Sequence, residues 1–177
     1  MMNIVEGQAA VSQIVKRCIR DEMCEGGLLA EVNTFIPSYR NEDTIEEPAI
    51  WVYEDVTTVV DGEGRLSKQV TLQTPFEFVC LVYDEDDLEK SELKGKELAG
   101  KVAAAIGKNF RRVDDNGNQI SSKPIIEGFY PYGAVDINEQ SDMVVVTSVR
   151  IIIEYTVNWV ISCINNNNND NDGDNGD

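Results

Sequence analysis

The stretch MVVVTSVRIIIEYTVNWVISC, residues 143–163, decides the fold class. Apolar and polar residues alternate along it with a period of two, as in a strand that turns one face to a core and the other to solvent. One face holds Val145, Val149, Ile151, Ile153, Tyr155, Val157, Trp159 and Ile161, and the other holds Ser148, Arg150, Glu154, Thr156, Asn158 and Ser162. The sequence therefore predicts a long final β-strand.

This strand is long for the domain that would contain it. At about 3.3 Å per residue it would extend roughly 70 Å, whereas a compact domain of this size is only about 40 Å across. We therefore expect the strand to bend sharply or to project and offer unpaired backbone to a neighbouring subunit. Two shorter strands joined by a bulge are the open alternative.

Two earlier runs predict an antiparallel hairpin. Residues 49–60, after Pro48, are rich in β-branched and aromatic side chains, and residues 70–82 alternate with a period of two. The turn signal Asp61-Gly62-Glu63-Gly64 separates them. Because Pro75 cannot donate a ladder hydrogen bond, we expect the second arm to lie at a sheet edge or to contain a bulge.

Two helices are predicted from apolar residues at helical spacing, over residues 8–23 and over LEKSELKGKELAGKVAAAIG, residues 88–107. The intervals 31–47 and 111–124 are typical of loops, and 125–142 fits a packed loop better than a short strand. The expected fold class is α+β, with an antiparallel or mixed sheet containing the long hairpin and the long last strand, packed against the two helices. We expect one domain over residues 1–164 and a disordered Asn- and Asp-rich tail over 165–177.

Charge and composition limit the possible functions. The 177 residues carry a net charge of −17, which disfavours tight binding to nucleic acid. The start of the chain lacks a signal peptide, and Arg150 and Glu154 interrupt the longest apolar stretch, so we expect neither secretion nor a membrane span, and synthesis in the cytoplasm.

The residue types that most enzymes need are missing from the sequence. There is no histidine, which rules out Ser-His and Cys-His pairs, and there is no phosphate-binding glycine loop. Cys18, Cys24, Cys80 and Cys163 include no C-x-x-C pair. Cys18, Cys80 and Cys163 are in phase with apolar neighbours and are best explained as small core residues. We therefore expect no enzyme activity, catalytic residue, cofactor or metal site.

Three charged clusters each leave a functional and a structural interpretation. Asp84 to Asp87 would supply an acid and base pair or cap the following helix, which helix preferences favour. Arg111-Arg112 would bind an anion or complement the end of that helix. The tail opens like a calcium loop at Asn168–Gly173, but it ends before the required bidentate glutamate.

Candidate interface residues come from the strands and the turn. The aromatic residues would anchor a partner or be buried in the core, the turn acids lie at the hairpin tip, and the charged pair belongs to the polar face of the last strand. The set is Trp51, Tyr53, Asp61, Glu63, Arg150, Glu154 and Trp159.

The order of these elements resembles that of the tail-terminator proteins of long-tailed phages, also called minor tail protein U-like proteins. The resemblance lies in EEPAIWVYEDV (46–56), QTPFEFVCLVYDED (73–86), SELKGKELAGKVAAAI (91–106) and VTSVRIIIEYTV (146–157). Together these segments span most of residues 9–159, without a signature motif. The segments 31–47 and 111–124 and the Asn/Asp tail depart from the compact members of the family.

The resemblance implies a structural protein of the virion tail neck. It would form a hexameric ring that caps the tail tube, ends tail polymerisation and joins the tail to the head connector, with the tail sheath as a further possible partner. DNA would pass through the lumen without specific binding. Alternatives are another neck or head-completion connector, a cellular α+β ligand-binding module, or a carboxylate hydrolase.

Overall fold

A computed structural model describes residues 3–38, 45–60, 69–83, 87–110, 120–138 and 142–158, and shows an α+β fold. Its six-stranded mixed sheet has the order β1-β2-β4-β6-β5, with β3 also paired to β4. All pairs are antiparallel except β1 with β2. The elements are α1 (Ile4–Glu22), β1 (Thr34–Ile36), β2 (Ala49–Glu54), β3 (Thr58–Val59), β4 (Gln69–Val82), α2 (Leu88–Asn109), β5 (Ser121–Asn138) and β6 (Asp142–Asn158).

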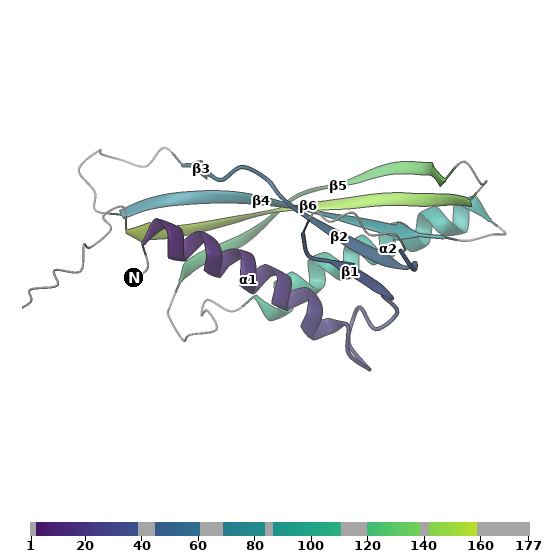
Figure 1. Cartoon of the computed structure of the whole chain (residues 1–177), viewed down its shortest axis with the longest axis horizontal. Helices are drawn as coiled ribbons and strands as arrows, with labels where there is room; N and C mark the ends of the chain where they lie inside the picture. Colours follow the sequence, from purple (N-terminus) through teal and green to yellow (C-terminus); the bar gives the residue numbers. More distant parts are fainter. Residues whose placement is uncertain are drawn as a thin grey trace, which may run out of the picture.

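Both helices pack on the same face of the sheet, so the molecule has two layers (Figure 1). The main core lies between the layers, where Ile14 of α1 and Val102 of α2 meet the inward side chains of the strands. Phe76, Phe78 and Tyr155 are the largest of these side chains, and each is at most 1% exposed. The period-two burial of β4 and β6 is the pattern that the sequence predicts.

Both helices begin at side-chain caps. Asn3 accepts hydrogen bonds from the backbone N–H groups of Val5 and Glu6, and the Glu6 carboxylate accepts one from the Asn3 N–H. This capping box starts α1 four residues before the predicted Gln8, because the predicted start rested on apolar spacing alone. Asp87 caps α2 by accepting from the N–H groups of Glu89 and Lys90, which confirms the capping interpretation for that residue.

Over its described residues the last strand neither projects nor bends sharply, and the bulged alternative is also wrong there. β6 pairs continuously with β4 over Val145–Asn158, and on its other side it pairs with β5 over Asp142–Thr156. Its described residues extend about 56 Å at roughly 3.3 Å each. The expectation failed because it assumed a round domain, whereas the sheet runs along the length of an elongated molecule (Figure 1).

The interval predicted as a packed loop, residues 125–142, is mostly strand. β5 covers Ser121–Asn138 and pairs with β6, with register shifts at Ile126/Gly128, Pro131/Gly133 and Asp136/Asn138. Glycines and prolines in this segment break its sequence periodicity, and in the structure they occur at two of the bulges. Within the predicted loop 31–47, Thr34–Ile36 forms β1 and pairs in parallel with β2.

The predicted hairpin is confirmed, but its second arm is not at an edge. β2 pairs with β4 antiparallel, and β6 covers the other side of β4 without a register shift at Pro75. The Pro75 carbonyl accepts from the Asp55 N–H. Pro75 has no N–H to return this bond, and it lies opposite the break between β2 and β3.

Several predictions fall outside the described residues. These are the interface candidates Asp61, Glu63 and Trp159, the pair Arg111-Arg112, residues 84–86, Cys163 and the tail 165–177. Cys18 and Cys80 are buried as predicted, and Cys24 is exposed. Within the described ranges no helix has the length and apolar character that crossing a bilayer requires.

Candidate interaction face

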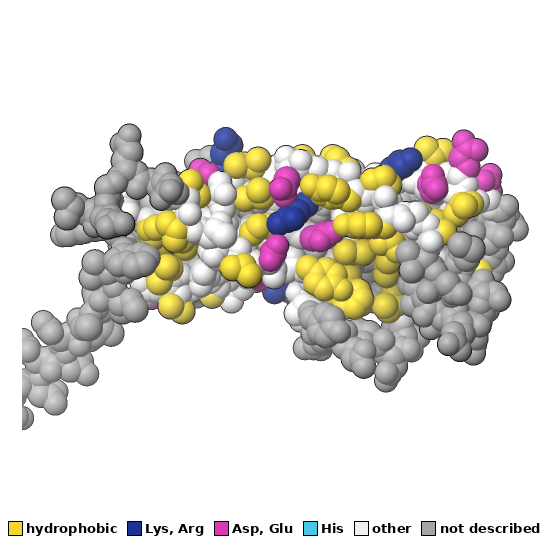
Figure 2. All heavy atoms as spheres, turned by 90° about the horizontal axis from the view of Figure 1, so that it is seen from above, with side chains coloured by type: hydrophobic (Ala, Val, Ile, Leu, Met, Phe, Trp, Pro, Cys, Tyr) yellow, Lys and Arg dark blue, Asp and Glu magenta, His cyan; other side chains and the backbone are white. Residues whose placement is uncertain are grey.

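The sheet face opposite the helices, which we call the helix-free face, brings four of the predicted interface residues together. Trp51 and Tyr53 of β2 point to this face, because Ile50 and Val52, which alternate with them along the strand, enter the core. By the same alternation Arg150 and Glu154 of β6 point to it as well. Figure 2 looks onto this face and shows apolar side chains surrounding a small charged group near its centre.

Arg150 lies at the centre of this face and connects distant parts of the chain. Its Nη2 donates to Asp55 Oδ2 at 3.1 Å, and its Nε lies 2.9 Å from Glu127 Oε2. Asp55 follows β2 and Glu127 belongs to β5, so one guanidinium bridges the two sides of the sheet. Because all three side chains are partly exposed, each pair contributes only about 0–1 kcal/mol to stability.

Neutral hydrogen-bond donors bind the remaining carboxylates of the helix-free face. Glu77 Oε1 accepts from the Ser148 hydroxyl at 2.7 Å and from the Tyr132 hydroxyl at 3.0 Å. Glu154 Oε2 accepts from the Gln73 amide at 3.0 Å. These contacts hold the two carboxylates in place.

The aromatic candidates lie between core and surface. The rings of Trp51 and Tyr53 stack with centroids 5.1 Å apart and planes 26° apart. Trp51 is half-buried, whereas Tyr53 is 37% exposed. A rigid stacked pair with one exposed member suits an interface anchor, because little side-chain freedom is lost when a partner covers it.

Exposed apolar side chains gather along β5, which is one edge strand of the sheet, and on the opposite side along β3 and the part of β2 that β1 does not pair with. We call Ile126, Phe129, Tyr130 and Tyr132 the β5 edge, and Tyr53, Val56 and Val59 the β2–β3 edge. Together they are seven of the ten large hydrophobic side chains that are exposed in the described part of the chain. The other three lie on the helices: Val5, Leu88 and Leu93.

A buried carboxylate joins the ends of the two helices, away from the helix-free face. Glu22 is 4% exposed and accepts from Lys108 Nζ at 2.8 Å, Asn109 Nδ2 at 2.6 Å and the Leu28 N–H at 2.9 Å. The hydrogen bond from Lys108 is the largest of the effects that lower the Glu22 pKa to about 2. Every oxygen of this carboxylate is satisfied, so the group is structural.

One groove of about 510 Å³ has the size of a small-molecule site. It lies between α2 and the ends of β2 and β4 and is lined by Glu31, Pro48, Val82, Tyr83, Lys94, Glu97, Leu98 and Lys101. Lys101 contacts Glu31 at 2.7 Å and Glu97 at 2.9 Å, and these bonds raise its pKa. Across the described ranges, no three His, Cys, Asp or Glu side chains group as metal ligands would.

Sequence reasoning missed the partners of Arg150 and the whole β5 edge. A signal was present for Glu77, the only charged residue within 70–82, because a half-buried charge in the middle of a strand calls for a partner. Arg150 in the other long strand is the cross-strand neighbour of Glu77. No comparable signal marks Tyr132, whose position depends on the bulge between Pro131 and Gly133.

Comparisons with known proteins give structural likenesses but no match to a family model or to a curated protein. Among the solved structures that match is a chain described as "Virion of native gene transfer agent (GTA) particle". It is 13% identical, with a TM-score of 0.39 over 84% of this chain and 97% of the other. A likeness at that level assigns no function.

Proposed function

We propose that this chain is a non-enzymatic structural protein of a virion, acting as a tail terminator. In this role it forms a ring, in the hexameric form that the family resemblance implies, at the neck of the tail. The ring caps the tail tube, ends its polymerisation and joins it to the head connector, and a tail sheath is a further partner. The element order of the resemblance, from α1 through the hairpin and α2 to the long last strand, supports this assignment.

The observation that carries the proposal is the apolar surface left on both sheet edges. A soluble monomer with a net charge of −17 gains nothing from exposing seven large hydrophobic side chains along two edges. Gathered apolar side chains on an otherwise charged surface are typical of protein interfaces. Two separate apolar edges on one subunit suit a ring, in which every copy contacts two neighbours.

The charge of the chain is compatible with a ring around passing DNA. A net-negative lumen repels phosphates and therefore leaves the DNA mobile. Among the helices and strands that the structure describes, α2 alone has a net positive charge, which comes from five lysines and three glutamates. The proposed ring therefore needs no nucleic-acid site, and DNA is its cargo only.

The test measures the mass of the purified chain by light scattering, alone and with tail-tube protein. We expect a closed oligomer of defined mass, and shorter tubes when the chain is added during tube assembly. Bovine serum albumin, added to give the same concentration of net negative charge, is the control for a non-specific effect of any acidic protein. A monomer at every concentration that leaves tube length unchanged would refute the proposed function.

The alternative of a cellular binding module has one observation in its favour, the groove beside α2. Its 510 Å³ are within the range of ligand sites. Lys101 is already neutralised by Glu31 and Glu97, however, which leaves little charge for a polar ligand. This alternative predicts a monomer or dimer in the same scattering experiment. Another neck or head-completion connector differs from a terminator only in its partner, and the tube-length measurement separates the two.

A further inference from the structure

We propose that copies of this chain contact each other head to tail, with the β5 edge of one copy against the β2–β3 edge of the next. The occupant of each edge is therefore a second copy of this chain. This inference rests on the proposed ring and adds to it which surfaces meet and in which orientation. It uses the apolar side chains that the fold leaves uncovered, and it follows from strand direction and charge.

The apolar side chains of the two edges overlap in height along the sheet but are not level. Tyr53 lies in one cross-strand row with Glu77, Arg150 and Gly128. Val59 lies in a second row with Leu72, Tyr155 and Ser122. The β2–β3 edge therefore lies at the heights of Ser122 to Gly128, whereas the apolar side chains of β5 begin at Ile126 and continue to Tyr132. A shift along the strands brings Val56 and Val59 of one copy against Phe129 and Tyr130 of the next.

Strand direction also permits this contact. β5 runs parallel to β4, because both are antiparallel to β6, whereas β2 and β3 run antiparallel to β4. In a ring the next copy has nearly the same orientation, so its β2 and β3 run antiparallel to β5. Side-by-side antiparallel strands are the commonest pairing in sheets.

The backbone of β5 limits hydrogen bonding across the contact, so side chains must supply most of it. Pro124 and Pro131 have no N–H to donate, and the register of β5 shifts three times against β6. Prolines and bulges of this kind prevent an edge strand from adding further strands without limit. A contact made by side chains is specific to the matching edge and favours a closed ring over a fibre.

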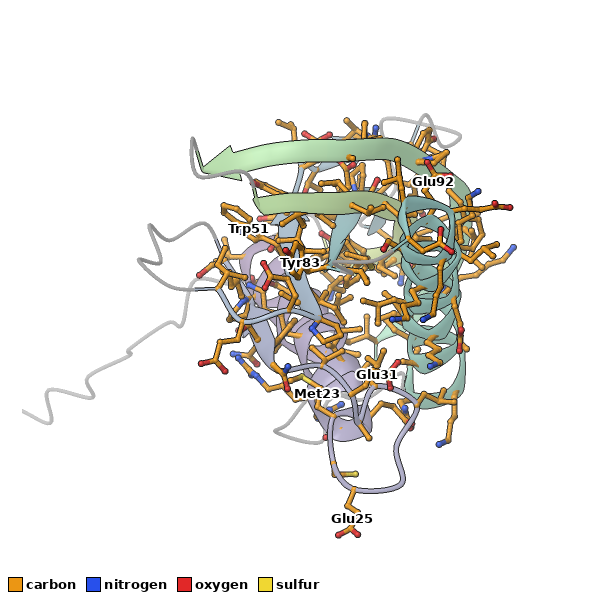
Figure 3. The ribbon with its side chains drawn as sticks, turned by 90° about the vertical axis from the view of Figure 1, so that its right-hand side faces the viewer. Met23, Glu25, Glu31, Trp51, Tyr83 and Glu92 are labelled. Carbon is orange, nitrogen blue, oxygen red and sulfur yellow. The ribbon has the colours of Figure 1, made fainter. Side chains whose placement is uncertain are left out.

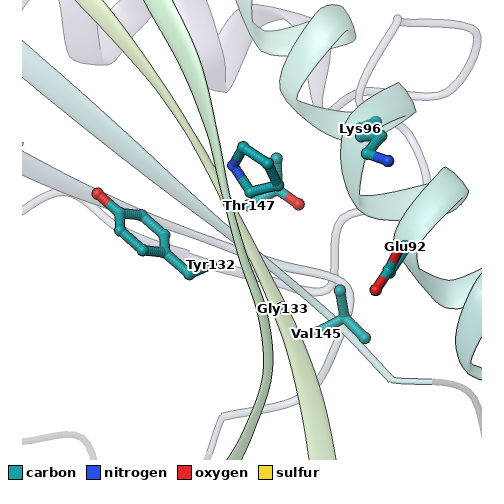
Figure 4. Close-up of a pocket in the computed structure, with 7 residues that line it drawn as sticks. Glu92, Lys96, Tyr132, Gly133, Val145 and Thr147 are labelled. Atoms are coloured by element: carbon teal, nitrogen blue, oxygen red, sulfur yellow. The ribbon is translucent and has the colours of Figure 1, made fainter.

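The two flanks of the molecule also differ in charge, and this difference favours the same contact. Seen down the long axis, α2 with Glu92 lies on one flank and Trp51 on the other (Figure 3). α2 has a net charge of +2 from five lysines and three glutamates, and with β5 it borders a groove of about 340 Å³ where Lys96 lies (Figure 4). Residues 45–60, on the other flank, hold four acids and no base. Opposite charges therefore meet in a head-to-tail contact and like charges in a head-to-head one.

The experiment uses one charged substitution on each edge of the full chain. Phe129→Asp places a carboxylate on the β5 edge, Val56→Asp places one on the β2–β3 edge, and Val5→Asp is the matched control at an exposed site on neither edge. Each edge variant alone should associate at least about tenfold more weakly, as expected for an anchor at an interface. The Val5→Asp variant should keep the parent mass, and circular dichroism should show that all three fold.

Mixing the two edge variants gives the decisive measurement. In a head-to-tail contact each variant keeps one intact edge, so the mixture should form a one-to-one heterodimer and nothing larger. If like edges pair, one variant dimerises alone and the mixture forms no heterodimer, which would overturn the inference. An oligomer that both variants form as well as the parent would also overturn it but leave the proposed ring standing. A parent chain that stays monomeric with tube protein would remove both.

Discussion

Two glycines of α2 allow the packing of this helix on the sheet to be tested with matched substitutions. A Cβ added at Gly95 would lie 2.8 Å from Thr147 Oγ1 and 3.5 Å from Thr147 Cβ on β6, whereas one added at Gly100 meets nothing within 4 Å. Thr147 is 2% exposed, and its β-branched side chain has little freedom to rotate away. Gly95→Ala and Gly100→Ala therefore change the same helix in the same way and differ only in what the new methyl group meets.

The size of the two effects follows from this difference. Replacing glycine by alanine inside a helix stabilises it by about 1 kcal/mol. Gly100→Ala should gain most of that amount. Gly95→Ala gains the same term but overpacks the contact with Thr147, which costs about 1–3 kcal/mol. The free energy of unfolding of the Gly95→Ala protein should thus fall below that of the Gly100→Ala protein by at least about 1 kcal/mol, or roughly 2–4 °C in Tm.

Urea denaturation followed by circular dichroism measures both variants, and a third substitution isolates the contact. In a Thr147→Ala background the clashing oxygen is gone, so Gly95→Ala should become neutral or stabilising. The cycle separates the contact from any general effect on α2. If Gly95→Ala stabilises the parent chain as much as Gly100→Ala does, α2 does not pack on β6 at this distance and the two-layer arrangement is wrong here.

Three further predictions follow from single side chains. Because the Glu22 pKa is lowered from 4.5 to about 2, its contribution to stability is complete above pH 4.5 and disappears toward pH 2, so Glu22→Gln should flatten the acid side of the stability curve in urea titrations. Burial raises the pKa of the Cys80 thiol to about 12, so a thiol reagent at about pH 8 should modify Cys24 in the folded chain and Cys80 only after unfolding, as mass spectrometry of peptides will report. Arg150→Met should cost no more than about 1–2 kcal/mol at low salt and less at high salt, and a loss that is unchanged by salt would contradict the ion-pair assignment.

Long runs with one dominant period could be predicted from the sequence. The alternation of residues 70–82 and of the described residues 144–158, and the helical spacing in 88–107, reflect burial on one face, which the fold preserves. Trp51, Tyr53, Arg150 and Glu154 are four of the predicted interface candidates, and alternation alone places all four on the helix-free face. A period identifies a face without knowledge of the partner strand.

The position of β5 could not be predicted, because bulges destroy its period. Each register shift moves the following side chains to the other face, so a strand with three shifts has no sustained alternation to read. Phe129 and Tyr132 therefore looked like loop aromatics. β1 was missed for another reason, since its three residues form a strand only through their pairing with β2.

The placement of β6 changes how the apolar surplus of the last strand must be interpreted. Its sequence is more apolar than a surface strand needs, and a projecting edge would have explained that. In the structure β4 and β5 satisfy both of its edges, and its inward side chains complete the core of the subunit. Any contact between copies must then use side chains that the subunit does not bury, and in the described residues seven of the ten large apolar ones lie at the β5 and β2–β3 edges. The burial of β6 and the exposure of these edges are parts of one arrangement, because the strand that covers β6 becomes the new edge.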